Sequence, residues 1–201
     1  FLLLYPAFDF GVRGEGEYTL RDVVAALDKG EEIAQIPGVV TARDGEVHFA
    51  PVRPPVEDLD ALPFPARHLV DLAVYRPLPN DEKRLPKSSI IGSRGCPFSC
   101  IFCDKATFGK SYRARSPEKV VQEMHILSRD FGVKDIAIVD STFTPNKRRL
   151  LAMLDAMEAN PPPVSWTCSC RANLLNEESL KRMKALGCWK IRIAIESGND
   201  E

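Results

Sequence analysis

Residues 95–103 read GCPFSCIFC and place three cysteines, Cys96, Cys100 and Cys103, at short fixed intervals. Three residues separate the first two thiols, and two residues separate the last two. The glycine and the proline beside Cys96 suit a tight, irregular backbone better than a helix or a strand. A loop of this kind can wrap its thiols around one metal centre, so the stretch predicts a metal-binding loop.

The number of thiols bears on the kind of centre. Iron–sulfur cubanes are normally held by four thiolates, so a set of three leaves one iron open to a substrate or a cofactor. Two alternatives stay open from spacing alone: a zinc site completed by a remote fourth ligand, and unrelated buried thiols. Short cysteine clusters in intracellular chains are mostly metal sites of some kind, which favours a metal over chance.

The pattern Cys-x-x-x-Cys-x-x-Cys, with the aromatic Phe102 just before the last cysteine, resembles the signature of the radical S-adenosylmethionine (SAM) superfamily. The resemblance implies that Cys96, Cys100 and Cys103 bind a [4Fe–4S] cluster whose open iron binds the amino and carboxylate groups of SAM. One electron from the cluster would then split the sulfonium to give a 5′-deoxyadenosyl radical. Phe102 would contribute its backbone or ring to the adenine site, and no catalytic residue is expected beyond the cluster ligands.

The composition is that of an ordinary globular protein. Of 201 residues, 44% are hydrophobic and 27% are charged, which is typical of folded soluble domains. The formal net charge of −1 gives neither a basic surface for nucleic acid nor a polybasic membrane patch. No apolar run approaches the roughly 20 residues of a transmembrane segment, and residues 1–5 are too short for a signal-peptide core. We expect a cytoplasmic protein that acts on a small-molecule or lipid-like substrate.

Three further cysteines lie outside the loop. Cys168 and Cys170 are two residues apart in a strand-like run and therefore point to the same face, and Cys188 follows a glycine at a helix end. The chain is large for a disulfide framework and clusters three of its six cysteines within eight residues, so we expect reduced thiols. We assign these three to packing; ligation of an auxiliary cluster is the alternative.

From residue 88 onward, strand-like and helix-like segments alternate. Ser116 is the expected N-cap of a first helix that Gly132 ends, and Asn176 that of a later helix that Gly187 closes. The expected strands are 89–94, 135–139, 164–170 and 189–195. Such alternation indicates parallel strands joined by right-handed crossovers, hence an α/β barrel, open or closed.

Function in such barrels collects at the carboxyl ends of the strands. The polar residues at these ends are Asp140, Ser141, Arg171, Glu196 and Ser197. A SAM ligand needs a carboxylate or carbonyl near its ammonium, a cation near its carboxylate and polar contacts at its ribose, and these side chains supply such groups. Each also has a structural interpretation, as a turn cap, a surface ion pair or turn chemistry.

Two of these strand ends resemble motifs of one large radical SAM subgroup. Residues 195–200 (IESGND) are similar to its fourth-strand motif, and residues 139–144 are similar to its second. The subgroup commonly has two consecutive Asp residues at the second strand's end, where this chain has Asp140-Ser141. The resemblance implies a contact of Asp140 with the methionyl amino group, and Ser141 is the departure from the motif.

The first 50 residues predict a strand, a loop and a helix, followed by a hairpin. Residues 8–12 form the expected strand, and residues 19–22 (TLRD) resemble a capping box that opens a helix closed by Gly30. Asp44-Gly45 between two extended segments is a strong hairpin signal. Residues 13–17 (RGEGE) carry a similarity to the cobalamin-binding domain that precedes the barrel in the same subgroup.

The segment between these two regions is rich in proline. Eight prolines in residues 51–87 prevent any long element from forming. The segment resembles the subgroup's connector, and residues 67–75 are expected to make one short helix within it.

Together these features predict an α/β chain in three parts. Residues 1–50 would be the C-terminal edge of a Rossmann-like cobalamin-binding domain, 51–87 a linker, and 88–201 the first four strands of a radical SAM partial TIM-type barrel. Since the chain begins without Met and stops after a strand-like segment, we expect a piece of a longer protein. The resemblance implies a flavodoxin- or ferredoxin-type electron donor and, if cobalamin binds, methyl transfer or oxidative cyclisation. The alternatives are a radical SAM enzyme without cobalamin and a non-catalytic metal or electron-transfer module.

Overall fold

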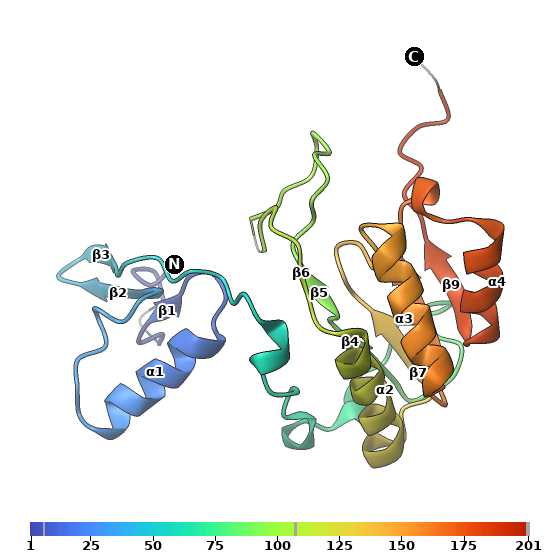
Figure 1. Ribbon diagram of the computed structural model, residues 1–201. Helices are drawn as coiled ribbons and strands as arrows, with labels where there is room; N and C mark the ends of the chain where they lie inside the picture. The colour runs from blue at the N-terminus through green and yellow to red at the C-terminus, as the bar shows by residue number, and fades with distance from the viewer. Residues whose placement is uncertain (6, 107, 200–201) are drawn as a thin grey trace. The chain divides into compact units, whose positions relative to one another are not determined.

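The computed structural model describes residues 1–5, 7–106 and 108–199. The chain divides into two compact units (Figure 1). The first comprises Phe1–Glu57 with Asp104–Gly109, and the second comprises Asp58–Cys103 with Lys110–Glu201. Most of the proline-rich segment therefore belongs to the second unit. The assignment of three domains stays a prediction.

The first unit packs one helix against a small antiparallel sheet. The helix is α1 (Glu17–Asp28), and the sheet has the order β1-β2-β3, from β1 (Gly11–Val12), β2 (Val39–Arg43) and β3 (Glu46–Phe49). The predicted hairpin joins β2 to β3, and Asp44 and Gly45 at its tip have φ of 52° and 80°. Positive φ at both central residues is the requirement that an Asp-Gly pair meets in a two-residue hairpin.

The predicted start of α1 was wrong by three residues. Gly16 is the N-cap of α1, so Thr19 lies inside the helix and is fully buried, where its hydroxyl donates to the carbonyl of Pro37 (2.9 Å). Arg53 donates to the same hydroxyl (2.8 Å) and pairs with Asp22. The two side chains that were expected to cap the helix instead tie it to the segment that follows β3.

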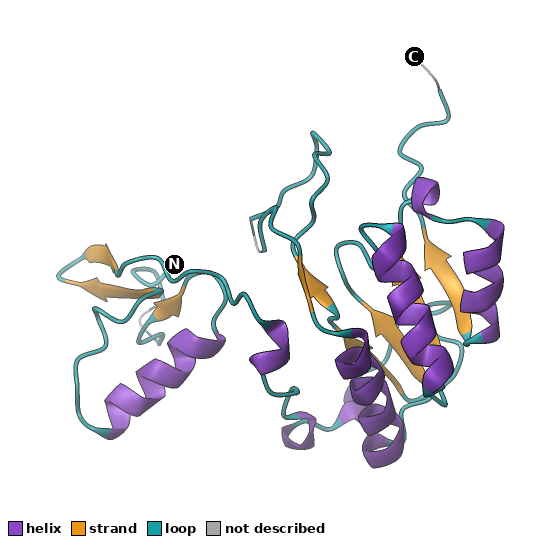
Figure 2. Cartoon of the chain, viewed as in Figure 1, coloured by secondary structure: helices purple, strands orange, loops and turns teal. Residues whose placement is uncertain are grey.

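The second unit contains a four-stranded parallel sheet with the order β4-β7-β8-β9 (Figure 2). The strands are β4 (Lys87–Ile90), β7 (Asp135–Ile138), β8 (Ser165–Ser169) and β9 (Cys188–Arg192). Three helices connect them and lie along one face of the sheet (Figure 1), namely α2 (Pro117–Phe131), α3 (Lys147–Ala159) and α4 (Glu177–Ala185). The predicted alternation of parallel strands and helices is confirmed.

Local signals place the helix ends where the sequence predicted them. Ser116 caps α2 by accepting from the backbone of Lys119, and Gly132 ends it in the left-handed region. Asn176 and Ser179 form a reciprocal capping box at α4. Among the helices of the described residues, none has both the length and the apolar character needed to cross a membrane.

The core of this unit lies between the sheet and the helices. Trp166 of β8 is fully buried, and its ring lies 5.5 Å from that of Phe143. Met124 and Leu127 of α2 and Leu154 of α3 are also fully buried. Each large apolar side chain removed from water in this way contributes roughly 1.5–3 kcal/mol, so the sheet holds its strand ends in a rigid frame.

Two predicted elements are each divided in two. Residues 67–75 form two short 3₁₀ turns, Arg67–Leu69 and Leu72–Val74, because Val70 between them is extended. The predicted strand 89–94 leaves the sheet at Ile91. It continues as β5 (Ser93–Arg94), which pairs with β6 (Arg113–Ala114) in a separate antiparallel ladder.

Gly187, between α4 and β9, provides a test of this frame. Its φ is +91°, and a Cβ there would lie 2.8 Å from the carbonyl oxygen of Val164. Gly132 also has positive φ (+64°), but it faces open space. We expect Gly132→Ala to cost about 1–2 kcal/mol of unfolding free energy and Gly187→Ala to cost more, because the backbone must also move. Urea unfolding of both variants measures the difference; equal losses would contradict the steric argument.

Candidate functional site

The two ends of the cysteine-bearing loop are hydrogen-bonded to each other where the loop leaves the sheet. β5 and β6 pair across the two ends of the loop, and the backbone N–H of Arg115 donates to the carbonyl of Gly92 (2.9 Å). The loop therefore starts and ends at one place beside the carboxyl end of β4. This geometry fixes where the segment that carries Cys96, Cys100 and Cys103 leaves the sheet.

A cavity of about 1160 Å³ lies between this loop and the carboxyl ends of the strands. Pockets of about 300–1,000 Å³ enclose drug-sized ligands, so this one has room for a nucleoside such as SAM. Its walls include side chains from the loop and from three strand ends. They are the loop residues Cys96, Phe98, Cys100, Phe102 and Cys103, the end of β7 with Ser141 and Thr142, and the ends of β8 and β9 with Cys170, Arg171, Asn173, Arg192 and Glu196.

The pocket brings together most of the residues predicted from the sequence. All three loop cysteines line it, together with Phe102, Ser141, Arg171 and Glu196. Asp140 and Ser197 are described residues that do not line it. Asp200, the last residue of the expected fourth-strand motif, lies outside the described residues.

The carboxylate of Asp140 is hydrogen-bonded to residues at the start of the cysteine-bearing loop. It is 6% exposed, and its carboxylate accepts from the backbone N–H groups of Gly92 (2.7 Å) and Ser93 (3.0 Å) and from the Ser93 hydroxyl (2.7 Å). A Cβ on Gly92 would lie only 3.2 Å from this carboxylate. Asp140 thus ties the end of β7 to the point where the chain leaves β4, and its contact with SAM stays a prediction.

Burial gives Asp140 a pH dependence that can be measured. Burial raises its pKa from 3.8 to about 6, although hydrogen bonds from Ser93 and Gly92 oppose the shift. The folded state therefore holds the proton more tightly than the unfolded chain, and the stability that this provides below the unfolded pKa is lost as the pH rises through about 6. A shift of about two pKa units corresponds to roughly 3 kcal/mol. We expect Asp140→Asn to remove this slope in urea unfolding of the cluster-free protein between pH ~4 and ~7.

Asp81 is the matched control for that measurement. Burial alone would raise its pKa, but hydrogen bonds from Arg192 and Lys87 outweigh burial and lower it to about 2. Its contribution is therefore present above pH 3.8 and is lost only as the pH falls towards 2. Asp81→Asn should leave the slope between pH ~4 and ~7 unchanged. A slope that persists in Asp140→Asn would contradict the assignment to Asp140.

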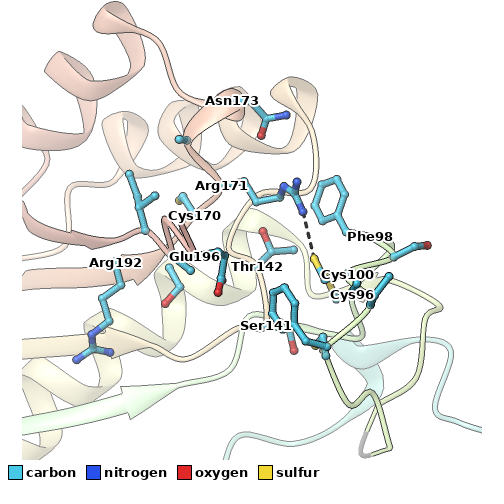
Figure 3. A pocket seen from close by; sticks show the side chains of 18 residues that line it. Cys96, Phe98, Cys100, Ser141, Thr142, Cys170, Arg171, Asn173, Arg192 and Glu196 are labelled. Carbon is cyan, nitrogen blue, oxygen red and sulfur yellow. Dashed lines mark hydrogen bonds between the residues drawn. The ribbon is translucent and has the colours of Figure 1, made fainter. Parts of the chain in front are cut away.

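Arg171 lies directly beyond β8 and contacts the cysteine loop. Its Nη1 lies 3.6 Å from Sγ of Cys100, and its guanidinium carbon lies 4.3 Å from the centre of the Phe98 ring (Figure 3). The sequence identified Arg171 as a candidate site residue but assigned no role to Phe98. Phe98 lies two residues before Cys100, a predicted ligand, and this position could have indicated that it belongs to the site.

Glu196 and Ser197 follow β9 in an irregular turn. Glu196 has φ of +64°, a left-handed conformation that costs a residue with a side chain of order 1 kcal/mol or more. The N–H of Ser197 donates to the carbonyl of Ile195 (2.7 Å), and the Ser197 hydroxyl accepts from Asn199. The turn directs Glu196 into the lining of the pocket, and Ser197 closes the turn.

The other three cysteines are buried, as predicted for packing residues. Cys168 and Cys170 have their sulfurs 3.7 Å apart. Cys170 also lines the pocket, which the packing assignment did not foresee. Cys170 immediately precedes Arg171 at the end of β8, and this position could have indicated that it lines the pocket.

The donor set of the pocket fits a cluster and a polar cofactor. No group of three or more His, Cys, Asp or Glu side chains in the described residues is gathered as it would be around a single metal ion. The thiolates of a cubane bind different irons and need not converge on one point. Thr142 is 3% exposed and lines the pocket, and its hydroxyl has no hydrogen-bond partner among the described residues. A buried hydroxyl without a partner is costly, and a polar ligand in the pocket would satisfy it.

Comparison with known proteins identifies relatives of the chain. An uncharacterized methyltransferase of Pyrococcus horikoshii is 37% identical, covering 96% of this chain and 41% of the relative. An anaerobic magnesium-protoporphyrin IX monomethyl ester cyclase of Rubrivivax gelatinosus is 32% identical, covering 87% of this chain and 32% of the relative. The chain thus spans about two fifths or less of the length of these relatives.

Solved structures share the fold along nearly the whole chain. The radical S-adenosylmethionine methyltransferase TsrM of Kitasatospora setae, solved with its tryptophan substrate and a SAM analog, superposes with a TM-score of 0.69 at 24% identity, covering 99% of this chain and 39% of TsrM. OxsB, a cobalamin-dependent SAM radical enzyme, gives 0.76 at 23% identity, covering 98% of this chain and 29% of OxsB. The predicted fold class is therefore confirmed.

The family is settled by a sequence model that spans more than half of the chain. The family described as the radical SAM superfamily matches residues 90–201, which include the cysteine loop and the three strand ends that line the pocket. The chain belongs to the radical SAM superfamily and has the fold of its cobalamin-dependent members.

Proposed function

We propose that this chain is the part of a radical SAM enzyme that binds a [4Fe–4S] cluster and SAM and cleaves SAM reductively. The observation that carries the proposal is the pocket, which is lined by three thiols from one loop and by a cation and a carboxylate from two neighbouring strand ends. When bound, the cluster supplies one electron that breaks the sulfonium C–S bond of SAM, yielding methionine and a 5′-deoxyadenosyl radical.

The residues of this chain would bind and orient the two groups. Cys96, Cys100 and Cys103 are the proposed cluster ligands. Arg171 would stabilise the SAM carboxylate, since a guanidinium is well suited to a carboxylate. Glu196 and Ser141 would offer acceptors and donors to the ammonium and the ribose, and Phe102 an apolar face to the adenine.

For the complete protein we propose cobalamin-dependent methylation or a related C–H functionalisation. Relatives named as methyltransferases, among them a hopanoid C-3 methylase of Methylococcus capsulatus at 35% identity, support methyl transfer to an unactivated carbon. The cyclases that act on magnesium-protoporphyrin IX monomethyl ester support oxidative cyclisation as the second candidate. Both kinds of relative favour a small-molecule or lipid-like substrate.

The domain assignment and the cellular setting belong to the same proposal. Residues 1–50 would be the C-terminal edge of the cobalamin-binding domain, 51–87 the linker and 88–201 the first part of the barrel. A flavodoxin- or ferredoxin-type protein would donate the electron. Reduced thiols and an exposed cluster loop suit the reducing cytoplasm, which we propose as the location.

Formation of 5′-deoxyadenosine tests the proposal. The full-length protein is purified without oxygen, reconstituted with iron and sulfide, and incubated with SAM and dithionite. We expect 5′-deoxyadenosine and methionine in equal amounts by liquid chromatography. A cluster that forms and takes up an electron but leaves SAM intact would contradict the enzyme and favour an electron carrier.

Cobalamin is tested separately on the same protein. We expect the purified full-length protein to retain cobalamin when it is supplied during reconstitution, as seen in its visible spectrum after gel filtration. SAM cleavage by a protein that retains no cobalamin would favour the alternative of a radical SAM enzyme without this cofactor.

A further inference from the structure

Phe98, Cys100 and Arg171 form a contact that joins the cysteine loop to the end of β8. The guanidinium of Arg171 lies over the Phe98 ring, 4.3 Å from its centre, and Nη1 donates to Sγ of Cys100 at 3.6 Å (Figure 3). Arg171 is separated from Cys100 by 71 residues, so the contact exists only because the fold brings the loop to this strand end. We refer to these three residues as the arginine clamp.

The geometry of the arginine clamp directs the guanidinium of Arg171 toward the sulfur of Cys100. Arg171 follows β8 at the start of a 3₁₀ turn (Ala172–Leu174), and its backbone is extended there (φ −87°, ψ 138°). A cation over an aromatic face gains about 0.5–2 kcal/mol, which holds the planar guanidinium in place. With one face against Phe98, its edge is free to direct an N–H at the sulfur of Cys100.

We propose that Arg171 is a positioning residue that sets the reduction potential of the cluster through Cys100, in addition to any contact with SAM. This rests on the proposed function. The reduction potential of an iron–sulfur cluster depends on its net charge and on hydrogen bonds to its sulfur ligands. The reduced cluster carries one more negative charge than the oxidised one, so a cationic donor on a ligand sulfur stabilises the reduced form more strongly. The clamp therefore makes the cluster easier to reduce.

The midpoint potential of the reconstituted cluster, measured without SAM, tests the clamp. An EPR-monitored redox titration of the full-length protein should show that Arg171→Gln moves the potential to a more negative value. Phe98→Leu should move it in the same direction by less, because the guanidinium keeps its charge but loses the ring that orients it. Arg171→Lys should restore part of the shift, since an ammonium can still donate to the sulfur.

Arg192 provides the matched control. It lines the same pocket, but it points away from the cysteines and pairs with Asp81 (Figure 3). Arg192→Gln removes the same charge from the pocket and should shift the potential less than Arg171→Gln does. An equal shift in the two variants would show a general charge effect and overturn the clamp.

A second readout separates the clamp from a role in SAM binding alone. If Arg171 only binds the SAM carboxylate, Arg171→Gln will weaken SAM binding in isothermal titration and leave the potential measured without SAM unchanged. That result contradicts this inference but leaves the proposed function intact. A wild-type protein that holds no cluster contradicts the proposed function itself.

Discussion

Replacing Cys100 with alanine is expected to abolish cluster binding. Three thiolates are the fewest that can hold a cubane with one open iron, so the loss of one thiolate leaves a second iron without a protein ligand. Cys170, the other pocket thiol, is only 7% exposed and is packed against Cys168. After anaerobic reconstitution, iron and acid-labile sulfide should fall from a full complement in the wild type to near zero in Cys100→Ala.

Cys188→Ala is the control for this experiment. Cys188 is buried in the core at the start of β9 and does not line the pocket, so its loss should leave the iron content at the wild-type value. Cys96→Ala and Cys103→Ala should behave like Cys100→Ala. Full iron content in any of the three loop variants would contradict the assignment of that cysteine as a ligand.

Replacing Glu123 with alanine is expected to destabilise the second unit strongly. Glu123 of α2 is 2% exposed, and its carboxylate pairs with Arg67 (2.7 Å) and with Arg115. Arg115 lies over the ring of Phe64 (5.2 Å). Removing one member of a buried ion-pair group leaves uncompensated charge and costs roughly 3–5 kcal/mol. Urea unfolding of Glu123→Ala should show a loss of this size.

Two further variants separate this effect from a general weakening of α2. Glu118→Ala removes an exposed carboxylate from the first turn of the same helix and should cost about 0.3–1 kcal/mol through the helix dipole. Replacing Glu123, Arg67 and Arg115 together with Leu, Met and Met leaves no unpaired charge and should recover much of the stability lost in Glu123→Ala. If the triple variant is no more stable than Glu123→Ala, buried charge is not the cause.

Glu123 also shows what the sequence could not predict about the linker. Eight prolines indicated a connector without long elements, and none formed. However, nothing in that composition indicates that Arg67 reaches a carboxylate 56 residues later or that Asp60 accepts from the N–H of Ser116 (3.0 Å) at the start of α2. Ion pairs between distant segments depend on tertiary packing, which local sequence patterns do not predict.

The elements with local causes were predictable. Ser116 with Pro117, Gly132 and the Asn176 capping box mark helix ends through short-range hydrogen bonds, and Asp44-Gly45 marks a hairpin through backbone conformation. The capping box expected at residues 19–22 failed because Thr19 finds a better partner in Pro37, far away in the sequence.

The same distinction applies to the pocket. Cys96, Cys100 and Cys103 are recognisable because their ligand spacing is local, and Arg171 and Glu196 because parallel strands bring their carboxyl ends to one rim. Asp140 has the charge expected of a ligand, but it lies outside the pocket lining and bonds to Gly92 and Ser93. Whether Asp140 or Ser141 lines the pocket depends on the break between β4 and β5, where Gly92 and Ser93 donate to the carboxylate of Asp140, and the sequence predicted no such break.

The most direct test of this account concerns the open iron. The reconstituted full-length protein is reduced, and its EPR spectrum is recorded before and after SAM is added, with 5′-methylthioadenosine as a control that lacks the amino and carboxylate groups. If three thiolates leave one iron for SAM, the g-values of the reduced cluster must change when SAM binds. A spectrum that stays the same at saturating SAM would show that the cluster has no site for it and would contradict the central claim.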